Sequence, residues 1–241
     1  MGSEGPGSEL ALDTVTTTSF LGQALDSPSL YNRLLEESRI SSAYSVAKHV
    51  LDICGALVGL VVLALLFPIL AMLICWEDRG HIFYKQTRVG QYGQPFVTYK
   101  FRTMIVDADG YMARYPELLE AWRKGGKLKD DPRITRIGGF LRRTSLDELP
   151  QVLNVLRGEM SLVGPRAIQF SEIEAFKDLI ELRQMVKPGL TGLWQVSGRS
   201  MTDYEQRCIL DCTYVLDRSF WLDVEILLRT LPAVINGIGA C

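Results

Sequence analysis

The chain has 241 residues, of which 47% are hydrophobic and 22% charged, a balance that excludes an intrinsically disordered protein and allows one sizeable domain with accessory segments. The formal net charge of −2 conceals an asymmetry: residues 1–47 hold six acidic and two basic residues, whereas residues 79–143 hold fourteen basic and six acidic ones, a local net charge of +8. The basic middle predicts an anionic partner, which charge alone leaves open among nucleic acid, lipid headgroups and a phosphorylated metabolite.

Residues 1–47 form an N-terminal extension that we expect to be partly flexible. The first eight residues are small and polar and lack the features of a signal peptide. A short helical pattern follows at residues 30–40. The five cysteines form no Cys-x-x-Cys pair and the chain has only two histidines, so no zinc-ligand spacing appears and free thiols are expected.

A hydrophobic run from Ile53 to Trp76 contains twenty-four residues and no charge. Because a helix needs roughly 20 apolar residues to cross the hydrocarbon core, the run predicts a membrane helix over residues 48–76. Pro68 divides the run, and a proline inside a helix removes a backbone hydrogen bond and clashes with the preceding turn. We therefore expect a bend near Phe67 and Pro68.

Basic residues flank both ends of this run. Lys48 precedes it, and Arg79, Lys85 and Arg88 follow it. Positive residues are retained on the cytoplasmic side, so the pattern favours a re-entrant helix that enters and leaves the membrane on that side. A full span with a tolerated kink is the alternative.

Residues 77–241 are expected to form a separate domain after the membrane helix. Short strands are predicted at residues 81–84 and 95–99, with a glycine turn at residues 90–93 between them. A helix is predicted over residues 107–124, and the apolar stretch 220–238 is typical of a helix that either lies in the membrane interface or packs in the core. The fold class is therefore α+β: a re-entrant helix, then a small, mostly helical domain with short strands and interfacial helices.

Two adjacent carboxylates, Asp147 and Glu148, lie at a predicted helix start. Pro150 suits the first helical position, and residues 151–157 continue the helix. One interpretation is purely structural, a capping box in which Ser145 and Glu148 satisfy backbone donors. The other is functional, because a helix start attracts phosphate and basic side chains such as Lys100 accompany it. Carboxylates among phosphates then call for a divalent ion such as Mg²⁺.

Six ordered motifs follow the membrane segment: Lys100-Phe-Arg-Thr-Met104, Asp131-Pro-Arg-Ile-Thr-Arg-Ile-Gly138, Thr144-Ser-Leu-Asp-Glu-Leu-Pro-Gln151, Asn154-Val-Leu-Arg-Gly158, Met160-Ser-Leu-Val-Gly-Pro-Arg166 and the glycine-rich loop from Lys187 to Arg199. Together they resemble the bacterial sugar transferases, the monotopic polyprenyl-phosphate phosphoglycosyltransferases. The resemblance covers residue 48 to the C-terminus and leaves only the first 47 residues outside.

The resemblance implies a reaction. The family moves a sugar 1-phosphate from a UDP-sugar to polyprenyl phosphate through a phosphosugar-enzyme intermediate and releases UMP. It implies that Asp147 is the nucleophile and that Glu148, with Asp147, holds Mg²⁺. The positions that it associates with substrate and phosphate binding are Lys100, Arg102, Arg142, Gln151, Arg166 and Arg199.

The resemblance also implies a place in the cell, at the bacterial inner membrane, with residues 77–241 as the catalytic domain on the cytoplasmic face. The partners are a UDP-sugar, polyprenyl phosphate and membrane lipid, and a homo-oligomer is left open. The chain departs from the family at Phe67, where Ser is usual before Pro68, and at Ala167, where Pro usually follows Gly-Pro-Arg. The rival interpretations are a non-catalytic scaffold, which the intact dyad disfavours, and a nucleic-acid binder, for which no recognition module is present.

Overall fold

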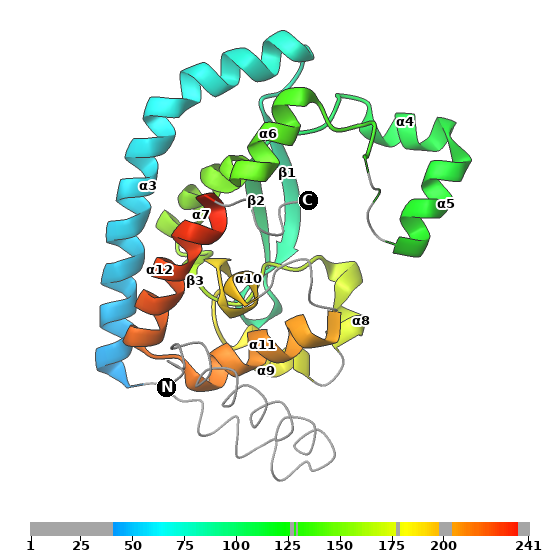
Figure 1. Ribbon diagram of the computed structural model, residues 1–241. Helices are drawn as coiled ribbons and strands as arrows, with labels where there is room; N and C mark the ends of the chain where they lie inside the picture. Colours follow the sequence, from blue (N-terminus) through cyan, green and yellow to red (C-terminus); the bar gives the residue numbers. More distant parts are fainter. Residues whose placement is uncertain (1–40, 126–127, 129, 177–178, 198–203, 236–241) are drawn as a thin grey trace, which may run out of the picture.

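The computed structural model describes residues 41–125, 128, 130–176, 179–197 and 204–235, so the predicted helix at residues 30–40 lies outside the described part. Helices dominate and the strands are short, as expected (Figure 1). The longer helices are α3 (Ser42–Glu77), α5 (Pro116–Gly125), α6 (Arg136–Thr144), α11 (Tyr204–Asp217) and α12 (Phe220–Ile235). The shorter ones are α4 (Ala108–Arg114), α7 (Val152–Leu156), α8 (Ile173–Phe176), α9 (Ile180–Gln184), α10 (Leu193–Val196), and the 3-10 turns η1 (Gln91–Gly93), η2 (Leu146–Gln151) and η3 (Phe170–Glu172).

Helix α3 is a single 36-residue helix, about 54 Å long at 1.5 Å per residue. It begins at Ser42, ahead of the expected boundary at residue 48, because the Ser41 hydroxyl accepts a hydrogen bond from the Tyr44 N–H and caps the helix. Among the described residues it alone is long and apolar enough to cross a membrane. Pro68 lies inside it, and the helix bends toward its C-terminal end without breaking (Figure 1).

One face of α3 packs along the rest of the described chain. Ala56, Leu63 and Leu70 are buried against it. The contact is close: a Cβ on Gly55 would stand 2.4 Å from Leu162 Cδ1, and one on Gly59 would stand 2.7 Å from Val152 Cγ1. The opposite face is apolar and exposed, with Val58, Val61, Leu65, Ile69, Met72 and Trp76. Such a face is suited to lipid.

The strands β1 (Phe83–Val89) and β2 (Pro95–Phe101) form an antiparallel hairpin around the expected glycine turn. Both are longer than predicted, because pairing runs without interruption from Phe83 with Phe101 to Val89 with Pro95. The rings of Phe83 and Phe101 stack at 5.5 Å, and Phe67 of α3 stacks on Phe83 at 5.7 Å. The residue before Pro68 is therefore seated on the hairpin.

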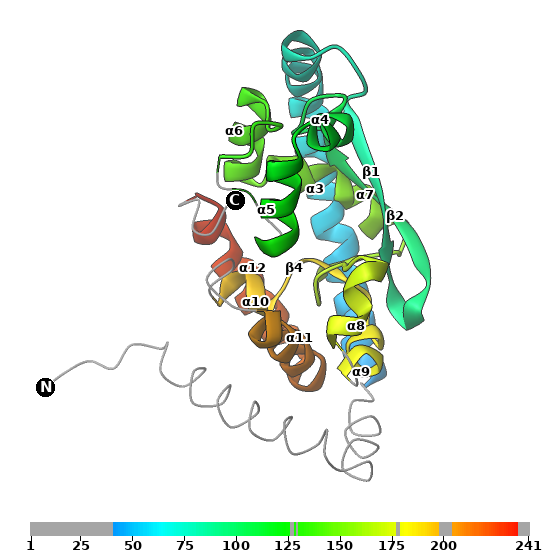
Figure 2. The same ribbon diagram turned by 90° about the vertical axis from the view of Figure 1, so that its right-hand side faces the viewer.

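The single helix predicted over residues 107–124 is wrong. The structure has two helices, α4 and α5, which meet at Tyr115 and stand apart at the upper right of Figure 1. Pro116 opens α5, and the residue before a proline is disfavoured in the helical region, so the chain turns there. Figure 2 shows the same pair from the side.

Strands β3 (Ser161–Val163) and β4 (Gly189–Thr191) form a short parallel pair that explains part of the glycine-rich loop. A Cβ on Gly189 would stand 2.1 Å from the backbone N of Gly164, and one on Gly192 would stand 2.2 Å from the Gly164 carbonyl oxygen. These glycines let two backbones touch. The contact fixes the course of the chain that leads to Arg166.

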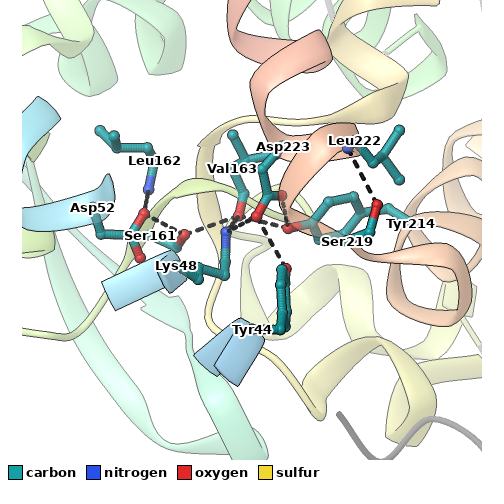
Figure 3. Close-up of polar contacts among 10 residues, drawn as sticks. All are labelled: Tyr44, Lys48, Asp52, Ser161, Leu162, Val163, Tyr214, Ser219, Leu222 and Asp223. Carbon is teal, nitrogen blue, oxygen red and sulfur yellow. Dashed lines mark hydrogen bonds and ion pairs between the residues drawn. The ribbon is translucent and has the colours of Figure 1, made fainter. Parts of the chain in front are cut away.

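A buried ion pair anchors the N-terminal third of α3 (Figure 3). Lys48 Nζ donates to Asp223 Oδ2 of α12 and to the carbonyl oxygen of Val163, each at 3.0 Å. The Tyr214 hydroxyl donates to Asp223 Oδ1 at 2.6 Å, and the Tyr44 hydroxyl donates to Oδ2 at 3.0 Å. Asp223 therefore gathers three donors from two other helices.

A carboxylate of α3 contacts the strand β3 as well. Asp52 Oδ1 accepts from the Ser161 hydroxyl and from the Leu162 N–H, both at 2.9 Å (Figure 3). Both charged residues of this stretch are thus satisfied by protein. Because an unpaired buried charge is costly, these contacts fix the depth and rotation of the helix against β3.

Replacing Asp223 with alanine is expected to lower the free energy of unfolding by about 3 kcal/mol, since Lys48 and two hydroxyls lose their shared partner in a buried site. The matched control is Glu225→Ala on the same helix, where the more exposed pair with Arg229 contributes no more than about 0.5 kcal/mol. Thermal unfolding in detergent compares the two. Equal shifts in Tm would contradict the anchor.

Candidate active site

The carboxylate pair lies on η2, directly after α6. Ser145 joins the two elements in the left-handed conformation with φ 56°, and its side chain makes no capping hydrogen bond. The capping-box interpretation is therefore wrong. Pro150 does not open a helix either, because it lies inside η2 and the helix α7 starts at Val152. The pair is thus presented by a tight turn rather than by a long helix start.

Glu148 forms an ion pair with Lys100 from β2, in which Nζ contacts Oε1. The side chain of Glu148 is 42% exposed, so this carboxylate is open to a ligand. Desolvation opposes its ionisation, but Lys100, Arg166 and Arg88 outweigh that effect and hold the pKa of Glu148 below its usual value. Glu148 is therefore negatively charged throughout the physiological range.

Asp147 lies in a different environment, although it is the next residue. It is 8% exposed, and burial together with the negative charge of Glu148 raises its pKa to about 6, against the opposing effects of Lys100 and Arg142. At pH 7 it is mostly ionised. A carboxylate that is only weakly solvated and lies among cations is a good nucleophile toward an anionic phosphate.

Two further predicted cations lie around the pair. Arg142 Nε donates to the Thr103 hydroxyl at 2.9 Å, and its charge lowers the pKa of Asp147. Arg166 follows β3, with its guanidinium 5.7 Å from the Trp194 ring, and its charge lowers the pKa of Glu148. Lys100, Arg142 and Arg166 therefore act on the same two carboxylates from three separate parts of the chain.

Three other predicted residues do not join this cluster in the same way. Arg102 turns to the end of α3, where Nη1 donates to Asp78 Oδ2 at 2.8 Å. Gln151 is buried at the end of η2, which limits what its amide offers to a ligand. Arg199 lies outside the described residues. The structure thus assigns Arg102 a role in fixing the helix rather than beside the dyad.

Arg88 of β1 is a cation that sequence reasoning placed only as a membrane flank. Its Nη1 donates to the Ala167 carbonyl oxygen at 3.1 Å and lies 3.6 Å from Glu172 Oε2. It also lowers the pKa of Glu148. No local pattern signals this role, because β1 carries the polar residues Lys85, Gln86 and Thr87 beside Arg88.

The expected metal ligands are the two carboxylates of the dyad. No group of three or more His, Cys, Asp or Glu side chains is gathered anywhere in the part of the chain that the structure describes. Two adjacent carboxylates still suit Mg²⁺, which commonly binds through one or two carboxylates and takes its other ligands from water and substrate phosphates. The residues present therefore fit the expected ion.

Comparison with known proteins shows the family to which the chain is related. The family profile described as "Bacterial sugar transferase" matches residues 43–237. The chain is 41% identical over 209 residues to "Exopolysaccharide production protein ExoY" of Sinorhizobium fredii, covering 85% of this chain and 92% of that protein. It is 46% identical over 168 residues to "Undecaprenyl-phosphate galactose phosphotransferase" of Salmonella typhimurium, covering 68% of this chain and 35% of that protein.

A third relative is "UDP-glucose:undecaprenyl-phosphate glucose-1-phosphate transferase" of Escherichia coli, 35% identical over 206 residues, which are 82% of this chain and 42% of that protein. The chain thus spans nearly all of ExoY but less than half of the other two. The match extends from α3 to α12 and includes the dyad and its cations. The chain belongs to the bacterial sugar transferase family.

Proposed function

We propose that this protein transfers a sugar 1-phosphate from a UDP-sugar to undecaprenyl phosphate, as the first membrane step in assembling a polysaccharide or glycoconjugate. The observation that carries the proposal is the ionised dyad of Asp147 and Glu148 among three cations, beside a helix with an apolar exposed face. The names of the Salmonella and Escherichia coli relatives supply the substrate classes. The sugar itself stays open between hexoses.

The proposed reaction has two displacements. A carboxylate oxygen of Asp147 attacks the phosphorus that bears the sugar, the bond to the neighbouring bridging oxygen breaks, and UMP leaves with the electron pair. An oxygen of polyprenyl phosphate then attacks the same phosphorus and displaces Asp147 as a carboxylate. No histidine base is required, because the nucleophile is already ionised. Ping-pong kinetics follow from the two steps.

The cations around the dyad have a clear task in this scheme. Phosphoryl transfer places negative charge on the non-bridging oxygens, and positioned positive groups stabilise it. Lys100, Arg142 and Arg166 supply such groups. Glu148 and Asp147 would hold Mg²⁺, which when bound neutralises phosphate charge. Lys100 would then move from Glu148 to a phosphate oxygen.

UMP release tests the proposal directly. Detergent-solubilised protein is incubated with polyprenyl phosphate and, separately, with UDP-glucose, UDP-galactose and their N-acetyl forms. We expect UMP and a lipid-linked sugar from at least one donor. Release of UDP instead of UMP would mean transfer of the sugar alone, and would overturn the proposed reaction.

The rate of the first displacement, in which Asp147 attacks the UDP-sugar, is expected to fall as the pH is lowered. Asp147 has to be ionised, and its raised pKa of about 6 means that the carboxylate is protonated as the pH falls through that value. The kcat/KM for the UDP-sugar should therefore be constant near pH 7.5 and fall to roughly a tenth of that value at pH 5. A donor-concentration series across this pH range measures it. A flat profile down to pH 5 would contradict the assignment.

We also propose that both ends of α3 lie on the cytoplasmic side of the inner membrane. Two anchors support this arrangement. Lys48 and Asp52 hold the first end on β3 and α12, and Glu77 accepts from the backbone N–H groups of Arg136 and Ile137 at 2.6 and 2.8 Å at the second end. Both ends of the helix contact the same domain. The simplest topology is therefore one in which the helix enters one leaflet of the membrane and returns to the side from which it came.

Single cysteines near positions 45 and 80, in a background without native cysteines, test this topology. A membrane-impermeant thiol reagent should label both from inverted vesicles and neither from intact cells. A cysteine introduced into a known periplasmic protein serves as the positive control. Labelling of one position from outside and the other from inside would establish a full span.

A further inference from the structure

A buried ion pair contacts the backbone of Arg166 and comes from helices that do not carry the dyad. Arg183 comes from α9 and Asp211 from α11, and each side chain is 3% exposed. Arg183 Nε and Nη2 both lie 2.9 Å from Asp211 Oδ2. The guanidinium also lies 4.6 Å from the Phe176 ring. These two residues are therefore held in one geometry from several sides.

The pair acts on both backbone groups of Arg166. Nη2 of Arg183 donates to the Arg166 carbonyl oxygen, and the Arg166 backbone N–H acts on the Asp211 carboxylate and lowers its pKa. The backbone of Arg166 also pairs with that of Gly189 in an isolated parallel bridge. Three separate contacts therefore fix the backbone of a residue whose guanidinium acts on Glu148.

The energetic cost indicates that the pair does more than fill space. Burial raises the pKa of Asp211 to about 6 in spite of Arg183, so the carboxylate is kept where it is poorly solvated. Apolar residues of similar volume often stabilise a fold as well as a buried ion pair does. Apolar residues, however, cannot donate a hydrogen bond to the Arg166 carbonyl oxygen or accept one from the Arg166 N–H, as Arg183 and Asp211 do.

We propose that Arg183 and Asp211 are positioning residues for the reaction: they fix the peptide of Arg166 so that its guanidinium is held beside Glu148 and the transferred phosphate. This inference rests on the proposed function. Neither residue is expected to touch substrate, since each side chain is only 3% exposed. Their contribution should therefore pass through Arg166 and disappear when that side chain is removed.

A double-mutant cycle tests the coupling. Asp211→Asn, Arg166→Ala and the double variant are compared by kcat/KM for UMP release. We expect Asp211→Asn to lower kcat/KM by ten- to a hundredfold in the wild-type background, and by less than twofold when Arg166 is already alanine. Arg183→Lys, which keeps the charge but loses the two-pronged geometry, is the milder second variant and should show the same pattern.

Asp131→Asn is the matched control, because Asp131 forms a comparably buried ion pair with Arg133 at 2.6 Å but makes no contact with Arg166. Its loss should be the same factor in both backgrounds. Losses from Asp211→Asn that are likewise equal in both backgrounds would overturn the positioning role alone. Absence of UMP release from the wild-type protein would overturn the proposed function, and this inference with it.

Discussion

Replacement of Asp147 with asparagine is expected to lower the rate of UMP release by at least about a thousandfold while leaving the fold intact. The amide has nearly the shape of the carboxylate but is not a nucleophile. Because the site raises the pKa of Asp147 to about 6, burial already disfavours its charge, and the neutral amide should if anything suit the position. We therefore expect this variant to lose activity while its free energy of unfolding stays at or above the wild-type value.

The same substitution at Asp107 is the control. The side chain of Asp107 is exposed and pairs with Arg114. Asp107→Asn should therefore keep wild-type UMP release. Thermal unfolding of both variants should match the wild type or exceed it. UMP release by Asp147→Asn within tenfold of the wild-type rate would mean that another group attacks phosphorus, and the dyad would then have to be assigned differently.

Replacement of Glu148 with glutamine is expected to lower UMP release by about a hundredfold or more, because it removes a proposed Mg²⁺ ligand and the partner of Lys100. It has a second, opposite consequence. The negative charge of Glu148 is one cause of the raised pKa of Asp147, so its loss should lower that pKa. The residual activity should therefore persist to a lower pH than in the wild type.

Two measurements separate these effects. Mg²⁺ titration should show a weakened dependence in Glu148→Gln, and the acid limb of kcat/KM should move below pH 6. Glu174→Gln, on the short helix α8, is a control of the same chemistry outside the dyad. Full activity of Glu148→Gln in the presence of a strong chelator would contradict the proposed metal role.

The sequence was sufficient where chemistry follows from a local pattern. The uncharged run predicted α3. The phosphate-binding role that the resemblance gives to Lys100, Arg142 and Arg166 stays a prediction, but the structure places their charges where they act on the dyad. The break at Pro116 is also readable from the sequence, since a proline there disfavours helix at Tyr115, although the helical pattern continues on both sides of it. Local rules compete, and in this case the proline prevailed.

Other features depended on contacts distant in sequence. The residues next to Arg102 in the sequence do not predict its ion pair with Asp78. Those next to Arg88 do not predict that its charge acts on Glu148. The Lys48 and Asp223 pair joins residues 175 apart. Such partners are determined by how the helices pack in three dimensions. A local sequence pattern shows only the neighbours of each charged residue along the chain, so it cannot predict them.

The close packing of α3 has a practical consequence for anyone preparing this enzyme. Deleting the helix to obtain a water-soluble catalytic fragment would uncover Leu162 and Val152, which lie against Gly55 and Gly59, and would leave Asp223 without Lys48. An unrelated transmembrane anchor would restore attachment but not this fitted surface. Detergents or nanodiscs that keep the helix seated are therefore the route to active material, and a shortened version is expected to aggregate.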